Sequence, residues 1–122
     1  MSGIYFHIPF CNKACNYCDF HFSTSFKYKE EVIKCILQEI YLRRNELKMP
    51  LRSIYFGGGT PSVLTDKEIN ELIKQCEQFY QISDDLEITL EANPEDISFD
   101  KIKSLVNVGV NRLSIGVQSF QD

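Results

Sequence analysis

The sequence predicts an α/β fold in which four parallel strands, with helices on their outer face, form part of a (βα) barrel. Strand-like runs alternate with segments of helical periodicity in the order βαβαβαβ, the pattern of parallel strands joined by right-handed crossovers. The predicted strands also alternate between apolar and polar residues, whereas parallel strands buried on both faces are almost continuously apolar. A curved sheet with a polar inner face, open to a polar ligand, accounts for both observations.

The first half of the chain contains two predicted strands and one helix. A strand over residues 3–9 leads into a cysteine-rich loop that continues to about Ser25. Apolar residues at helical spacing predict a helix over residues 28–46. The apolar stripe of this helix consists of Val32, Ile33, Ile36, Leu37, Ile40 and Tyr41. A second strand over residues 53–56 ends at three consecutive glycines.

The second half repeats the alternation. Thr65-Asp66-Lys67-Glu68 is a capping box and predicts the start of a second helix. The apolar stripe of that helix is Ile69, Leu72, Ile73, Cys76, Phe79 and Tyr80. A third strand is predicted over residues 86–90, a helix over residues 98–108 with Gly109 as a left-handed cap, and a fourth strand over residues 112–117. Four strands do not close a barrel and leave an open edge, so we expect an incomplete domain.

The chemically notable loops all follow strand ends, where parallel α/β proteins bind ligands. Gly57-Gly58-Gly59-Thr60-Pro61 lacks the lysine of a P-loop, and it is either a tight turn or a place where main chain approaches a ligand. Glu91, on the polar face, needs a partner. That partner is either a ligand ammonium or hydroxyl group or, as the sequence alone slightly favours, Arg112. Gln118 has the same ambiguity, since its amide also suits neighbouring backbone.

Three cysteines lie within eight residues, at Cys11, Cys15 and Cys18. Five cysteines in total exclude a complete disulfide framework, and the close spacing indicates metal binding in a reducing cytoplasm. Three thiolates can hold an iron–sulfur cluster and leave one iron open. The alternative is a zinc site completed by His7 or His21, although zinc sites usually contain paired C-x2-C elements.

The remaining residues of these types have plainer interpretations. Cys35 and Cys76 fall in helical segments and are expected in the core. His7 is expected to pack beside Tyr5 rather than bind a metal. A net charge of −4 provides no basic surface for nucleic acid, and no apolar run approaches the roughly 20 residues of a membrane span. A signal peptide is also not apparent, which agrees with a cytoplasmic location.

Together these motifs resemble the radical S-adenosylmethionine (SAM) superfamily. The resemblance covers nearly the whole chain. It rests on C-x3-C-x2-C, Gly-Gly-Gly-Thr-Pro, Leu-Glu-Ala-Asn-Pro and Ser-Ile-Gly-Val-Gln-Ser-Phe, in the order of the oxygen-independent coproporphyrinogen III oxidase group. It implies a [4Fe–4S] cluster on Cys11, Cys15 and Cys18, which binds SAM and cleaves it to methionine and a 5′-deoxyadenosyl radical. The matching SAM contacts are Tyr5, Tyr17, Gly58, Gly59, Thr60, Glu91 and Gln118.

One difference from the motifs of the group indicates which branch the chain resembles. Oxidases of this group have a fourth cysteine two residues after the third, where this chain has Phe20. Phenylalanine there resembles the haem chaperone branch, which implies haem or porphyrin as a further ligand and an electron donor protein as a partner. A coproporphyrinogen III oxidase is the enzymatic alternative, and a zinc-stabilised interaction module is the alternative from another class.

Overall fold

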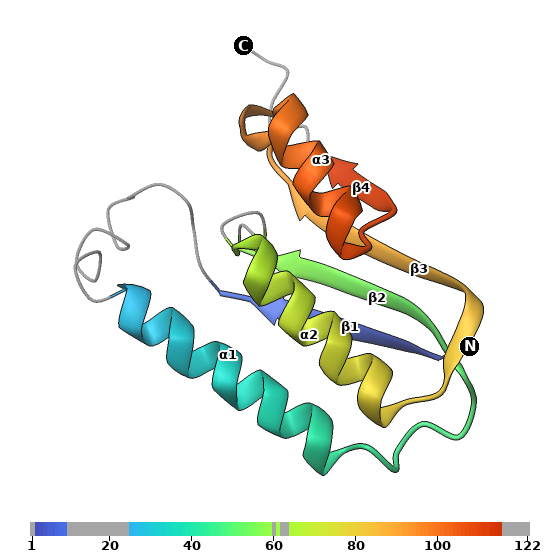
Figure 1. Ribbon diagram of the computed structural model, residues 1–122. Coiled ribbons are helices and arrows are strands. Elements are labelled where there is room, and N and C mark those ends of the chain that lie inside the picture. Colours follow the sequence, from blue (N-terminus) through green and yellow to red (C-terminus); the bar gives the residue numbers. More distant parts are fainter. Residues whose placement is uncertain (1, 10–24, 60, 62–63, 116–122) are drawn as a thin grey trace.

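The structure is a computed structural model that describes residues 2–9, 25–59, 61 and 64–115. The elements in chain order are β1 (Gly3–Ile8), α1 (Ser25–Leu42), β2 (Leu51–Gly58), α2 (Asp66–Phe79), β3 (Ile82–Ala92), the short 3-10 helix η3 (Pro94–Asp96), α3 (Phe99–Val108) and β4 (Arg112–Ile115). Apart from η3, which was not expected, this is the predicted alternation of strands and helices (Figure 1).

The four strands form one parallel sheet in the order β1-β2-β3-β4. Each strand is added beside the previous one, and the three crossover helices lie together on one face of the sheet (Figure 1). The helices therefore cover one face, and none of the described helices lies on the other. This arrangement confirms the predicted fold class of four parallel strands with helices on the outer face.

The hydrophobic core fills the space between the sheet and the helices. It is built from alternate residues of each strand and from the inner stripes of the helices, as period-2 and period-3.6 patterns require. Its fully buried side chains include Ile8, Leu51, Ile54, Phe56, Leu64, Ile69, Leu72, Cys76, Leu90 and Leu105. α2 is the central helix, and its Gln75 donates a hydrogen bond of 2.9 Å to the backbone carbonyl of Leu37 in α1.

Two residues predicted to face the core are exposed. Cys35 is a free, exposed cysteine, whereas Cys76 is buried as expected. Tyr41 is 40% exposed at the edge of the stripe, where its ring meets the edge of Phe79 and supports the guanidinium of Arg44, 4.0 Å from the ring centre. The two corrections have different causes. Tyr41 lies at the margin of the buried stripe of α1, whereas Cys35 lies on the side of the helix opposite the buried Ile33 and is turned to solvent.

Helix ends follow the local sequence signals. The Thr65 hydroxyl caps α2 by accepting a hydrogen bond from the Glu68 backbone N–H, and the Glu68 carboxylate accepts one from the Thr65 backbone N–H, as the capping box predicts. Ser98 caps α3 in the same way by accepting from the Lys101 backbone. Gly109 has φ 111° in the left-handed region and ends α3, also as predicted.

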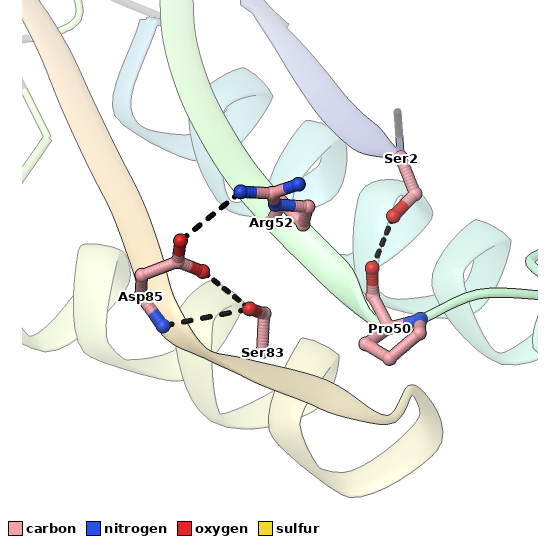
Figure 2. A network of polar contacts seen from close by, with 5 residues as sticks. All are labelled: Ser2, Pro50, Arg52, Ser83 and Asp85. Carbon is pink, nitrogen blue, oxygen red and sulfur yellow. Dashed lines mark hydrogen bonds and ion pairs between the residues drawn. The ribbon is translucent and has the colours of Figure 1, made fainter.

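Polar contacts join the amino ends of β1, β2 and β3 (Figure 2). Arg52 of β2 forms an ion pair of 3.0 Å with Asp85 of β3, and Ser83 donates a hydrogen bond to the same carboxylate. The Ser83 hydroxyl and then the Arg52 charge hold the pKa of Asp85 below its ordinary value. The Ser2 hydroxyl binds the Pro50 carbonyl beside them. This end of the sheet lies opposite the loops that the sequence singles out.

None of the helices in the described ranges is both long enough and apolar enough to cross a membrane.

The two helical cysteines are expected to differ sharply in reactivity. Burial raises the pKa of Cys76 to about 12, with a further contribution from the Glu77 charge, so its thiol stays protonated and covered at neutral pH. At pH 8, iodoacetamide should modify Cys35 quickly and Cys76 only after unfolding, as followed by mass spectrometry of the separate peptides. Equal rates in native protein would contradict the packing of α2.

The same pKa shift predicts a direction for stability against pH. Because the pKa of Cys76 is higher in the folded than in the unfolded chain, its contribution to stability is complete below the ordinary value of 9.0 and is lost as the pH rises towards about 12. Urea unfolding between pH 8 and pH 11 should show this decline, and Cys76→Ala should flatten it.

Candidate ligand site at the carboxyl ends of the strands

The uncovered face of the sheet is polar, as the strand alternation predicts. In β1 and β2 it carries Tyr5, His7 and Tyr55, while Phe6, Ile8, Ile54 and Phe56 point into the core. In β3 and β4 it carries Thr89, Glu91 and Ser114. Thr89 is the most covered of these polar side chains, only 5% exposed, because it lies between the neighbouring strands.

Glu91 is the best-defined acidic group on this face. It lies near the carboxyl end of β3 and is half-buried. Its two oxygens are bound by β2: the Tyr55 hydroxyl donates to Oε2 at 2.8 Å, and the Gly58 backbone N–H donates to Oε1 at 3.1 Å. Each carboxylate oxygen has a further acceptor position. The carboxylate is therefore oriented by the fold and is still able to accept hydrogen bonds from a ligand.

The proposed salt bridge between Glu91 and Arg112 is wrong. Arg112 instead pairs with Glu87, at 3.0 Å between Nη1 and Oε1. The strand register explains this, because Ser114 lies opposite Glu91 while Arg112 lies opposite Thr89, nearer the start of β3. Glu91 forms no ion pair with another described residue. A salt bridge therefore does not account for this carboxylate, and a ligand is the partner that remains from the sequence analysis.

The glycine loop is tied to β1. Gly57 and Gly58 belong to β2 and pair with His7 and Ile8, so the strand is longer than the sequence suggested. The Gly59 N–H donates to the Ile8 carbonyl at 2.7 Å. Gly58 has φ 105°, and a Cβ there would lie 2.8 Å from that carbonyl oxygen. The glycines therefore allow β2 to turn closely against the end of β1, directly before the segment that contains the cysteines.

Aromatic rings cover the loop on the open face. Tyr5 and Tyr55 stack with ring centres 5.5 Å apart and an angle of 14° between their planes. A Cβ at Gly57 would lie 2.5 Å from the Tyr5 hydroxyl, so the glycine makes room for this side chain. His7, two residues further along β1, stacks on Tyr5 with ring centres 6.3 Å apart, which agrees with a packing role for the histidine. Tyr5 is 57% exposed and presents its ring to solvent beside the glycine loop.

Tyr55 is the member of this group that the sequence analysis missed. Hydrogen bonding with Ser114 lowers the pKa of its hydroxyl, but the hydrogen bond to Glu91, burial and the charge of Glu91 raise it further, and the net pKa is above 10.0. Tyr55 is thus a hydrogen-bond donor at neutral pH. Its signal was present in the sequence, since Tyr55 precedes Gly57 by two residues and shares its face of the strand.

Several predicted site residues lie outside the described part of the chain. These are Cys11, Tyr17, Thr60, Gln118 and the remaining cysteines of the loop, Cys15 and Cys18, together with His21 and Phe20. Among the described residues, no three His, Cys, Asp or Glu side chains gather in a way that could hold a metal ion. The structure thus brings Tyr5, Gly58, Gly59 and Glu91 together and leaves the metal ligands as predictions.

Residues 5–122 match the Radical SAM superfamily, nearly the full length of the chain. The chain belongs to the radical SAM superfamily. The sequence is similar to "Heme chaperone HemW" of Bacillus subtilis, with 39% identity over all of this chain and 33% of the relative. It is also 40% identical to the HemW of Lactococcus lactis, over 99% of this chain and 31% of the relative.

Two further relatives extend this comparison. A bovine protein named "Radical S-adenosyl methionine domain-containing protein 1, mitochondrial" is 35% identical over 99% of the chain and 28% of its own length. The solved structure of coproporphyrinogen III oxidase (HemN) from Escherichia coli has a TM-score of 0.76 and 32% identity, and the match covers 98% of this chain and 28% of HemN. The chain spans about a third of the length of the HemW relatives that it matches.

Replacing Gly58 by alanine is expected to destabilise the protein more than the same change at Gly109. Both glycines have positive φ, which costs an alanine about 1–2 kcal/mol. Only at Gly58 does the added Cβ also meet backbone, at 2.8 and 2.9 Å from atoms of Ile8, whereas at Gly109 the nearest atom is 3.6 Å away. We expect Gly58→Ala to lower the unfolding free energy by about 3 kcal/mol, measured by urea denaturation.

Gly109→Ala is the matched control, because it adds the backbone strain without the steric contact. A loss of about 1–2 kcal/mol is expected there. Equal losses at both positions would contradict the close approach of the glycine loop to β1.

Proposed function

We propose that this chain is the amino-terminal part of a radical SAM protein of the haem chaperone (HemW) type. The cluster would be a [4Fe–4S] cluster on Cys11, Cys15 and Cys18, with SAM bound beside it. One observation carries the SAM site: Glu91 is oriented by Tyr55 and Gly58, and it forms no ion pair with another described residue. Its remaining acceptor positions suit the ammonium group or the ribose hydroxyls of SAM.

The described residues fit such a ligand in other respects. The loop at Gly58 and Gly59 has no side chains that would keep a ligand away from its backbone, and the exposed Tyr5 ring lies at its edge. In this proposal Tyr17, Thr60 and Gln118 contribute the further contacts. The cluster would supply the electron that cleaves SAM, and a separate donor protein would reduce the cluster.

The choice of a chaperone rests on similarity and on one residue. The HemW relatives of Bacillus subtilis and Lactococcus lactis are 39% and 40% identical to the chain. Phe20 stands where oxidases of the group have a fourth cysteine. Haem is then the proposed cargo of the whole protein. Oxidative decarboxylation of coproporphyrinogen III is the second candidate, favoured by the likeness to HemN at a TM-score of 0.76.

The SAM site is tested by Glu91→Gln in the full-length protein after anaerobic reconstitution with iron and sulfide. Glutamine keeps the size of the side chain but loses the charge, and hydrogen bonds to charged groups contribute about 1.5–3 kcal/mol. We expect the Kd for SAM to rise by at least about tenfold, measured by equilibrium dialysis. Glu87→Gln is the matched control, since Glu87 lies on the same strand but pairs with Arg112. This variant should bind SAM with the wild-type Kd.

The same preparation tests whether the cysteines bind an iron–sulfur cluster or zinc. Reconstituted protein should absorb broadly near about 400 nm, and Cys15→Ser should abolish this band. Stoichiometric zinc without that absorbance would instead support an interaction module and overturn the cluster.

Chaperone and oxidase are separated by their products. The full-length, cluster-loaded protein should bind haem and transfer it to an acceptor haem protein without forming protoporphyrinogen. Rapid conversion of coproporphyrinogen III in the presence of SAM and a reductant would reverse the choice.

A further inference from the structure

We infer that Tyr55 is a positioning residue for the SAM site, which acts by orienting the Glu91 carboxylate; the inference rests on the proposed SAM binding. Tyr55 does not itself have to touch the ligand. Its hydroxyl lies 2.8 Å from Oε2 of Glu91, and the Gly58 N–H lies 3.1 Å from Oε1. One donor on each oxygen fixes the rotation of the carboxylate plane, which a single donor would leave free.

The position of Tyr55 is in turn set by the sheet. It lies opposite Tyr5 on one side and Thr89 on the other in the parallel register of β1, β2 and β3. Its ring stacks on Tyr5 at 5.5 Å, nearly parallel. Because the neighbouring strands hold the ring and the backbone holds the strand, the hydroxyl is available at a defined place before any ligand arrives.

The direction of the hydrogen bond follows from the protonation states. A tyrosine hydroxyl of ordinary pKa is already protonated at neutral pH, and the pKa of Tyr55 is raised further, so the hydroxyl donates and the carboxylate accepts. The bond therefore occupies one acceptor position on Oε2 and leaves the remaining positions of the carboxylate to a ligand. A carboxylate without this donor has more rotamers to lose when a ligand binds, and the affinity falls accordingly.

Tyr55→Phe tests this inference, because it removes the hydroxyl and keeps the ring that stacks on Tyr5. In the full-length, cluster-loaded protein we expect the Kd for SAM to rise about tenfold. The decisive measurement is the same change in a Glu91→Gln background. If Tyr55 acts through the Glu91 carboxylate, Tyr55→Phe should leave the Kd of Glu91→Gln unchanged, so the two effects are strongly non-additive.

Tyr80→Phe is the matched control for loss of a tyrosine hydroxyl. The Tyr80 hydroxyl donates to the Arg43 carbonyl at 3.1 Å, on the helical side of the sheet. This variant should unfold at a lower temperature and bind SAM with the wild-type Kd. A merely structural role of Tyr55 would give the same pattern, with reduced thermal stability and an unchanged Kd, and that result would overturn the inference.

The remaining outcomes separate this inference from the function on which it rests. If the wild type binds SAM and Glu91→Gln weakens binding, but Tyr55→Phe has no effect, only the role of Tyr55 is overturned. If Tyr55→Phe weakens binding equally in both backgrounds, Tyr55 acts independently of Glu91, and the inference is again wrong. If the cluster-loaded wild type does not bind SAM, both the proposed function and the inference about Tyr55 are wrong.

Discussion

The site depends on the way in which β2 holds the Glu91 carboxylate of β3. Tyr55 and the Gly58 backbone each bind one of its oxygens, and both come from the same strand. This arrangement requires the parallel register in which Tyr55 lies opposite Thr89. A shift by one residue would turn the side chains of either strand to the other face, so the buried residues that set the register also set the site.

The polar groups at the two ends of the sheet make different kinds of contact. At the amino ends, Arg52 and Asp85 form an exposed ion pair, an interaction that usually contributes little to stability. At the carboxyl ends, Glu91 lies without an ion pair among the described residues, and the strands close tightly around the glycines. Burial of apolar side chains between the sheet and the helices stabilises the fold. The open face can therefore present polar groups that contribute little to the core.

Membership in the radical SAM superfamily agrees with this separation. The chain is similar to HemW chaperones and to the oxidase HemN over nearly its full length, although it spans about a third or less of each relative. The fold of the chain is similar to that of HemN, with a TM-score of 0.76. The properties that would separate chaperone from oxidase are placed by our proposal at Phe20 and in the remainder of the full-length protein.

The sequence by itself determined the order of the elements, the polar and apolar faces of the strands, and the caps at Thr65, Ser98 and Gly109. These features depend on local periodicity and on backbone preferences, which nearby residues encode. Only the tertiary structure decided the partners of Glu91 and Arg112 and brought the Tyr55 hydroxyl to the Glu91 carboxylate. Those outcomes depend on the register between strands, which is set by packing between residues distant in the sequence.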